Sequence, residues 1–418
     1  MKKIILLAIT LLLVLSLFSC QKQSDDNPEV KKYEPNTWDG SVAEAFEGGE
    51  GTEESPYLIA SGAQLAYLAK SVNDGTSYEN KYISLLCDID LNNIEWTPIG
   101  NGELAFGGNF NGNGHIIKNL KISNVNKFSS VVGDLTTYNG FSGLFGFCEN
   151  VSLSNLSIDN AAISISNVDE FGSLYIGTLA AKIETQSLSK VENIKIDNTV
   201  ITIDNSKTTD PKKGSTSMGI GGLIGLLKSE KASTKTSINS VQCKDISVSY
   251  GENYLEYNFI GGIVGYVTNY NDFECSDFLS QLNTEAPPYR SCTFHFGAFG
   301  QIYRASGNIN LSNGFSKLSL DKKDQGKYGE IHDHQANAII GKEIGSYDKD
   351  VYNFENLFGY IETTENSVVE KTYNLYTIHE ESAEINETNC FGCESLPENH
   401  GFGNKIWNLD DLSNPTLH

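Results

Sequence analysis

The group of side chains closest to a metal site is His332-Asp333-His334. If this segment is a strand, residues two apart point to the same face at about 7 Å, so the two imidazoles could share one ion. A zinc site needs three or four protein ligands, and the sequence offers no third ligand beside this pair. We therefore interpret the group as a polar loop or an exposed strand and expect no metal there.

A second candidate is Cys390-Phe-Gly-Cys393, which has the C-x-x-C spacing. No second cysteine pair completes a zinc site, and no strand-to-helix pattern of the thioredoxin type surrounds it. Outside the cytoplasm, a disulfide or two inactive thiols remain as alternatives. Three other cysteines lie in apolar segments that predict buried thiols: Cys87, Cys148 and Cys243.

Oxygen ligands form a third candidate group. Asp88, Asp90 and Asn92 alternate as calcium ligands do, but they lack the glycine and the closing glutamate of an EF-hand loop. We interpret them as turn residues, expect no cofactor, and leave Ca²⁺ as the one ion that the pattern allows. His115, which follows Asn-Gly-Asn-Gly, is interpreted as a structural turn residue as well.

The sequence singles out no catalytic residues. Glycoside hydrolysis needs two carboxylates about 5 to 9.5 Å apart, and 53 acidic residues give no reason to prefer any pair. Elimination from a uronide needs a cation beside the abstracted proton, and the chain has two arginines, Arg290 and Arg304. The patterns G-x-S-x-G and H-E-x-x-H and the phosphate loop are absent from the sequence. The formal net charge of −23 excludes nucleic-acid binding, because such a surface repels phosphates.

Short strands and turns must position all of these residues. From Trp96 to Gly146, apolar residues alternate in bursts that glycines and asparagines close, which is typical of strands joined by tight turns. Two units then recur: N-L-K-I-S-N at 119–124, 155–160 and 193–198 and loosely at 245–249, and a glycine unit at 143–146, 177–180, 222–225 and 262–265. Glycine units that start 34, 45 and 40 residues apart indicate a solenoid or a propeller.

A resemblance to a known family rests on W-T-P-I-G at 96–100, F-G-G-N-F-N-G-N-G-H at 106–115 and G-L-F-G at 143–146. These units resemble the GLUG-motif proteins, most of which are bacterial surface proteins, over residues 38–267 and again at 402–418. The resemblance implies an all-β fold, a right-handed parallel β-helix of the pectate-lyase type. The alternative is a propeller, in which Ile122, Ile158 and Ile196 would lie in separate sheets.

The N-terminus predicts export and a lipid anchor. Residues 1–19 have the form of a signal peptide, because two lysines precede an apolar run that is too short to span a membrane. Cys20 resembles the lipidated cysteine of bacterial lipoproteins, with an ordinary signal peptide as the alternative. Residues 20–37 predict a disordered tether. In it, Ser24-Asp25-Asp26 resembles the acidic surface-export signal of Bacteroidales lipoproteins, unless it is only a solvated linker.

Three further segments follow the tether. Residues 38–93 predict an N-terminal cap with a helix that begins at Ser61, where Gln64 completes a capping box. We expect this helix to cover the open edge of the β-helix. Residues 94–267 carry the repeats, and residues 268–418 contain degenerate repeats with insertions and a closing strand near Trp407.

These observations favour a lipid-anchored protein of the outer membrane that is exposed on the cell surface. We expect a non-enzymatic adhesin or a module that binds a glycan or a host protein, since 20 tyrosines and 20 phenylalanines can supply stacking surfaces. The alternative is a polysaccharide lyase or glycoside hydrolase on the same scaffold. A groove in which two carboxylates converge, or in which a carboxylate meets Arg290, Arg304 or a lysine, would favour the enzyme.

Overall fold

The computed structural model describes residues 32–123, 125–132, 135–166, 168, 171–204, 217–229, 234–250, 257–269, 272–286, 293–304, 308–322, 334–344, 350–365, 367–376, 383–395, 397, 407–408 and 416–417. The chain forms two compact units, Met1–Glu34 and Pro35–His418, and the elements below belong to the second unit. Among the described residues, no helix is long and apolar enough to cross a membrane.

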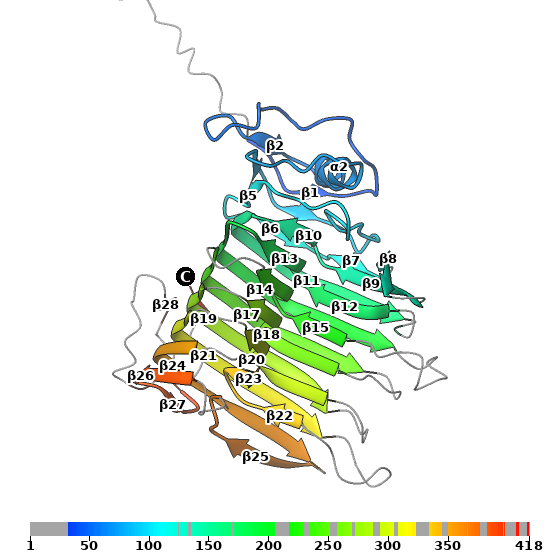
Figure 1. Ribbon diagram of the computed structural model, residues 1–418. Coiled ribbons are helices and arrows are strands. Elements are labelled where there is room, and N and C mark those ends of the chain that lie inside the picture. Colours follow the sequence, from blue (N-terminus) through cyan, green and yellow to red (C-terminus); the bar gives the residue numbers. More distant parts are fainter. Residues whose placement is uncertain are drawn as a thin grey trace, which may run out of the picture. The chain divides into compact units, whose positions relative to one another are not determined.

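The second unit is all-β apart from one α-helix in the described residues, and its two large sheets curl around a common core (Figure 1). Its long strands in the first sheet lie side by side in chain order: β11 (Ser152–Ser166), β14 (Leu188–Asp204), β17 (Lys235–Tyr250), β19 (Asp272–Ala286), β21 (Asn308–Lys322) and β24 (Asp350–Glu365). Seven short strands begin this sheet: β1 (Asn36–Thr37), β2 (Tyr57–Ile59), β3 (Tyr82–Leu85), β4 (Ile89–Asp90), β5 (Asn109–Asn111), β6 (Ile116–Lys118) and β7 (Lys121–Ile122).

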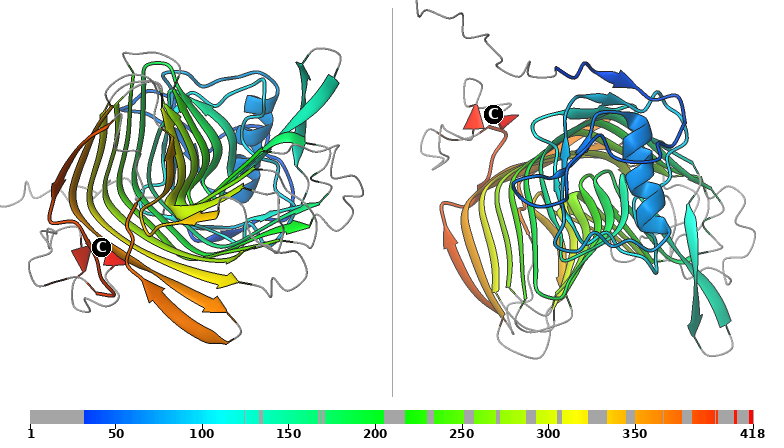
Figure 2. Two further views of the ribbon diagram at one scale, coloured as in Figure 1. Left: turned by 60° about the horizontal axis from the view of Figure 1, so that its bottom comes forward. Right: turned by 90° about the horizontal axis from the view of Figure 1, so that it is seen from above.

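Between the long strands the chain passes through the second sheet. Its strands are β8 (Asn126–Val132), β9 (Leu135–Ser142), β10 (Phe145–Glu149), β12 (Phe171–Gly177), β13 (Ala180–Thr185), β15 (Ser217–Gly221), β16 (Ile224–Ser229), β18 (Tyr257–Asn269), β20 (Thr293–Arg304), β22 (His334–Ala336) and β23 (Ile340–Ile344). Each passage adds strands parallel to those of the passage before. The hairpin of β8 and β9 extends away from the stacked strands in both views of Figure 2.

The register excludes a propeller. Ile158 is the Cα partner of Ile196 in the next strand, and Ile122 is the partner of Ile163 in β11, so all four lie in one sheet. Among the described residues, antiparallel pairing is limited to β8–β9, β24 with β25 (Val368–Thr372), β28 (Trp407–Asn408) with β29 (Thr416–Leu417), and one bridge between Gly48 and Leu58. A propeller blade needs four antiparallel strands, so the prediction of an all-β fold with parallel strands is confirmed.

Asparagines form the corners of the first sheet. Asn155, Asn193, Asn313 and Asn356 have φ between 52° and 54°, the left-handed region that asparagine tolerates better than most residues. The side-chain amide of each also donates to a polar side chain one passage earlier, for example Asn193 Nδ2 to Asn155 Oδ1 at 2.9 Å and Asn155 Nδ2 to Asn111 Oδ1 at 3.0 Å. The same ladder continues from Asn313 to Asp277 at 3.1 Å and from Asn356 to Asn313 at 2.9 Å. These bonds explain why asparagine recurs in the repeat.

The glycine units stack directly on one another in the second sheet. A Cβ atom at Gly143 would lie 2.2 Å from the carbonyl oxygen of Gly177, and one at Gly222 would lie 2.2 Å from that of Gly262. Any larger residue would therefore push successive passages apart. The repeat of these glycines marks the points where the backbones of successive passages approach most closely.

The helix α2 (Gly62–Asn73) has Ser61 as its N-cap, which confirms the predicted start. Leu65, Leu68, Ala69 and Val72 form its buried face, and Ser61 Oγ accepts the amide of Gln64 at 3.3 Å. The other half of the capping box is displaced by one residue, because Gln64 Oε1 accepts the amide of Ala60 at 2.7 Å and not that of Ser61. Gln64 Nε2 then donates to Glu47 at 3.1 Å, which joins the helix to the preceding loop.

The stacked strands continue through the segment where the sequence pattern is lost. The strands β19, β21 and β24 keep the parallel register, although only one asparagine-type corner remains in each. At the far edge, β24 pairs with β25, β26 (Ala383–Thr388) and β27 (Phe391–Gly392). The expected closing strand at Trp407 forms a separate small sheet with β29 and is absent from the two large sheets.

Candidate functional site

Three neighbouring strands at the N-terminal end of the first sheet place polar residues on its outer face. Inward residues of β3, β5 and β11 are buried, namely Ile83, Phe110 and Leu153. Because side chains alternate along a strand, the residues on either side of them point outward. They form two rows across the sheet, Tyr82–Asn109–Ser152 and Ser84–Asn111–Ser154, whose members are Cα partners.

A compact loop makes a wall beside these rows. The backbone amides of Glu50, Gly51 and Thr52 all donate to the carbonyl oxygen of Ser55, at 2.8, 2.9 and 3.2 Å. The amide of Tyr82 donates to the carbonyl oxygen of Gly51 at 3.2 Å, which ties the loop to β3. Gly51 has a φ of 74°, and a Cβ there would lie 2.4 Å from the Tyr57 ring, so this position requires glycine. The loop holds the exposed Glu53 beside the sheet.

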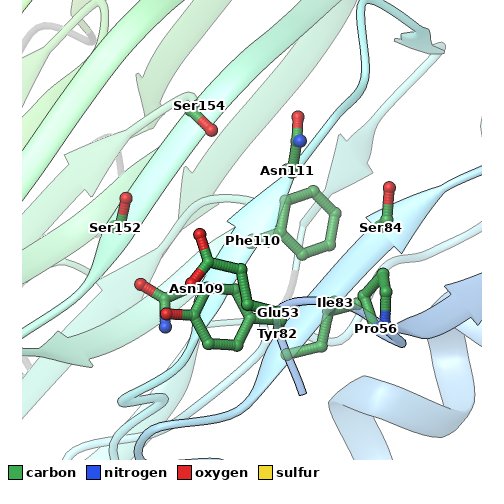
Figure 3. Close-up of a pocket in the computed structure, with 10 residues that line it drawn as sticks. All are labelled: Glu53, Pro56, Tyr82, Ile83, Ser84, Asn109, Phe110, Asn111, Ser152 and Ser154. Carbon is green, nitrogen blue, oxygen red and sulfur yellow. The ribbon is translucent and has the colours of Figure 1, made fainter. Parts of the chain in front are cut away.

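The loop and the two rows enclose a depression with a volume of about 230 Å³ (Figure 3). It is lined by two aromatic rings, two amides, three serine hydroxyls, one carboxylate and two aliphatic side chains, which belong to Glu53, Pro56, Tyr82, Ile83, Ser84, Asn109, Phe110, Asn111, Ser152 and Ser154. In Figure 3, Glu53, Tyr82 and Asn109 are grouped at one end, and the hydroxyls of Ser84 and Ser154 lie towards the other.

These groups suit the recognition of hydroxyl-rich molecules. A tyrosine ring offers an apolar face to a sugar ring, and its hydroxyl can bond to a polar group of the ligand. Amide and hydroxyl side chains supply donors and acceptors together. Asn111 is the more rigid of the two amides, because its Oδ1 accepts the Asn113 amide at 2.8 Å and the Asn155 side chain at 3.0 Å. Glu53 is the only carboxylate of the ten lining residues, whereas glycoside hydrolysis needs two.

A second depression, of about 380 Å³, lies between α2 and the segment that contains Trp96. Ala66, Ala69 and the edge-to-face pair of Trp38 and Trp96 line it, with ring centroids 5.5 Å apart. Its charged residues already have partners: Lys70 pairs with Asp74, and Glu95 accepts the backbone and side chain of Ser123 at 2.7 and 2.6 Å. This depression is therefore an apolar surface without a free charge to orient a ligand.

A carboxylate meets lysines in the second sheet. Glu184 lies 2.5 Å from Lys182 Nζ and 3.9 Å from Lys228 Nζ, and Lys182 Nζ sits 4.2 Å from the centre of the Phe147 ring. The side chains of Glu184 and Lys182 are only 11% and 15% exposed, so a substrate could not reach the carboxylate without displacing the lysines. We interpret this cluster as an ion pair that holds neighbouring strands together.

Asp88, Asp90 and Asn92 take part in hydrogen bonds within the fold, and Asn92 lies in a turn with a φ of 56°. Asp88 Oδ1 accepts the amide of Ile116 at 3.0 Å and lies 3.2 Å from His115 Nδ1. Asp90 Oδ1 accepts the Asn92 amide and the Asn119 side chain, both at 2.7 Å. No group of three or more metal-ligating side chains occurs in the part of the chain that the structure describes.

The described cysteines are free thiols. Cys87, Cys148 and Cys243 are buried, which confirms the prediction. Burial raises the pKa of the Cys148 and Cys243 thiols well above its ordinary value. Burial also raises the pKa of the Cys390 and Cys393 thiols, which is the opposite direction to the lowered pKa typical of reactive cysteines.

Several predicted residues lie outside the described residues: Cys20, Ser24, Asp25, Asp26, Arg290, His332 and Asp333. His334 begins β22 and Arg304 ends β20, but their side chains also lie outside the described part of the chain. Conversely, sequence reasoning missed Tyr82, Asn109 and Glu53. A signal for the site was present in the sequence, because a polar asparagine flanks Phe110 on each side, as in a strand with one exposed face. We interpreted these asparagines only as turn residues, because they belong to the Asn-Gly pattern.

Comparison with known proteins supports the fold more than the function. No protein-family model matches the chain. A "Putative Gly-rich membrane protein" of Evansella cellulosilytica is 33% identical over 122 residues, and the halomucin of Haloquadratum walsbyi is 30% identical over 167 residues. The matches cover 29% and 37% of this chain, and the chain spans only 13% and 2% of the two relatives.

A solved structure shares the architecture. The crystal structure of a "putative immunoglobulin A1 protease" from Bacteroides ovatus matches 89% of this chain and 95% of its own chain, with a TM-score of 0.51. The two sequences are 19% identical, so the match shows a common β-rich fold and nothing about activity.

Proposed function

We propose that this protein is a non-enzymatic, lipid-anchored protein of the cell surface that binds a glycan on the outer face of a right-handed parallel β-helix. The observation that carries the proposal is the depression in which Tyr82, Asn109 and Glu53 meet. An aromatic face beside amides and hydroxyls is the chemistry that a sugar ring requires.

The order of the strands supports the proposal of a β-helix. The chain alternates between two parallel sheets and returns to the same register after each passage, as a coil does. The stacked asparagine corners and glycine units also support a β-helix. The resemblance of their motifs to GLUG-motif surface proteins supports it as well. We propose no cofactor. Ca²⁺ is the only ion that we leave open, and Asp88 and Asp90 already accept hydrogen bonds within the fold.

The proposed location at the cell surface rests on the N-terminal sequence. Cys20 would carry the lipid that attaches the protein to the outer membrane, and Ser24-Asp25-Asp26 would direct it to the outside. A Cys20→Ala variant should leave the membrane fraction after signal cleavage. A variant with alanine at residues 24, 25 and 26 should stay membrane-bound but become protected from added protease. Retention of the first in membranes, or continued cleavage of the second, would contradict the respective proposal.

Glycan binding can be tested with the full-length chain in mild detergent on an array of host and bacterial glycans. The wild type should be retained by selected glycans without cleaving them, and Tyr82→Ala should lose retention. Tyr257→Ala is the matched control, because Tyr257 is an exposed tyrosine in β18 of the other sheet. Equal loss in both variants would show that Tyr82 plays no specific part.

The alternative activity, as a polysaccharide lyase or glycoside hydrolase, would appear in the same preparations as shortened polysaccharide. Glu53 is the single carboxylate of the depression, and Glu184 is paired with lysines, so neither offers the two-carboxylate arrangement. Turnover that is lost in Glu53→Gln or Glu184→Gln would overturn the binding proposal.

A further inference from the structure

The depression carries a negative charge at one end and no positive charge. Glu53 is its only charged lining residue, and no lysine, arginine or histidine lines it. Glu53 is exposed, and the compact loop that ends at Ser55 holds it at the end where Tyr82 and Asn109 lie (Figure 3). The protein as a whole carries a formal charge of −23, so the long-range field adds to the local one.

We infer that this depression selects amino sugars with a free, protonated amine and discriminates against sugars that carry a carboxylate. The inference rests on the proposed glycan-binding function and names its ligand class. A sugar ring that stacks on Tyr82 can direct its amine to Glu53, which then forms a charge-assisted hydrogen bond. A uronic acid in the same place brings a second carboxylate towards Glu53, and no cation of the lining compensates for it.

The neutral part of the site does not depend on charge. Tyr82, Asn109 and Asn111 interact with ring faces and hydroxyls that all hexoses share. An acetylated amino sugar therefore still fits the depression but loses the ion pair with Glu53. The structure thus predicts the order free amine first, acetylated amine second and uronic acid last.

The size of the preference follows from the exposure of Glu53. Exposed ion pairs contribute little because water and salt screen them, so the free amine should gain about two- to five-fold in affinity over the acetylated form. The gain should decrease as the salt concentration rises, whereas binding of the acetylated form should not change.

Three oligosaccharides of equal length distinguish the possibilities: a glucosamine oligomer, an N-acetylglucosamine oligomer and a galacturonic acid oligomer. Their affinities for the full-length chain in mild detergent are measured at about pH 6, where ordinary glutamate carboxyls are ionised. Glu53→Gln should abolish the preference for the glucosamine oligomer over the N-acetylglucosamine oligomer. Glu54→Gln is the matched control, because Glu54 is the next residue, is also exposed, and is not part of the lining.

The outcomes separate the two proposals. If the wild type binds none of the three oligomers and no glycan on the array, the glycan-binding function itself fails. If it binds glycans but prefers the galacturonic acid oligomer, or if Glu53→Gln leaves the preference intact, the charge selection is wrong and glycan binding stands. A loss of preference in Glu54→Gln as large as in Glu53→Gln would also overturn the role of Glu53.

Discussion

The long strands of the first sheet divide into two groups that keep one register but differ in their corners. The strands β11, β14 and β17, here called the two-corner strands, each contain two residues with φ between 53° and 57°. The strands β19, β21 and β24, the one-corner strands, each contain one, at 52°. The register slips by one residue where the second corner disappears, between Cys243 and Ile246 of β17.

The two groups also differ in their core. Inward positions of the two-corner strands hold aliphatic residues such as Ile158, Ile196 and Val241, whereas the one-corner strands hold rings such as Phe278 and Phe354. The comparison shows that the asparagine-containing repeat in the sequence depends on the corner residues and not on the strands between them. Once the second corner is lost, the motif disappears although the stacking of strands continues.

The largest effect should come from the aromatic core of the one-corner strands. Phe278 is fully buried, and its ring centroid lies 5.7 Å from that of Phe299. Phe278→Ala should lower the free energy of unfolding in urea by about 3–5 kcal/mol. Val241 is its Cα partner in β17, and Val241→Ala should cost about 1–2 kcal/mol, since two methyl groups are removed at about 0.8 kcal/mol each. Equal losses would contradict the contrast between the two cores.

A somewhat smaller effect should come from Gly314 in β21. A Cβ atom there would lie 2.1 Å from Cζ of Phe278, so Gly314→Ala must displace a buried ring. We expect a loss of about 1–3 kcal/mol in the same urea titration. Adding Phe278→Leu to Gly314→Ala should recover part of it, because the shorter side chain vacates the space. A double variant whose loss equals the sum of the two single losses would show that the ring is not the obstacle.

The second corner can be tested within the two-corner strands. Asn198 has a φ of 54°, and its Nδ2 donates to Asp159 at 2.8 Å. Asn198→Ala should cost about 1–2 kcal/mol, because it places alanine in the left-handed region and removes this bond. Asp245 has a φ of 53° but faces β19, which has no second corner. Asp245→Ala should therefore cost about 1 kcal/mol less, and an equal cost would mean that the ladder adds nothing beyond local strain.

The smallest effect on stability at neutral pH should come from two buried thiols, one in the last two-corner strand and one in the first one-corner strand. Burial raises the pKa of Cys243 in β17 and of Cys275 in β19 well above the ordinary value. A group whose pKa is raised in the folded protein stabilises it fully below its unfolded pKa, which is about 8.5 for cysteine, and that stability is lost as the pH rises further. The melting temperature should be constant from about pH 7 to 8 and fall above it, and less steeply in Cys275→Val. An identical alkaline slope in that variant would exclude Cys275 as a contributor.

The difference between two-corner and one-corner strands also explains which parts of the fold could be predicted from the sequence. Asparagine corners and glycine units constrain the sequence through backbone conformation and close approach, so the parallel strands up to β18 could be predicted from their spacing. In the one-corner strands only burial remains, and many apolar residues satisfy it. The candidate site was not predictable, because Tyr82, Asn109 and Ser152 come from three segments that only the register brings together.

The short first strand decides how the fold resists mechanical force. The chain enters the first sheet at β1, which pairs with β4 and whose ends are held by backbone bonds from the Asn36 amide to the Asp88 carbonyl at 2.9 Å and from the Trp38 amide to the Asp90 carbonyl at 2.8 Å. A force applied to the chain on the N-terminal side of β1 would break these bonds one after the other. It would first act on a buried side chain at Trp38. That side chain is buried against Trp96, and its indole donates to the carbonyl oxygen of Ser41 at 2.7 Å. We therefore expect Trp38 to contribute most to the force at which the stacked strands begin to separate.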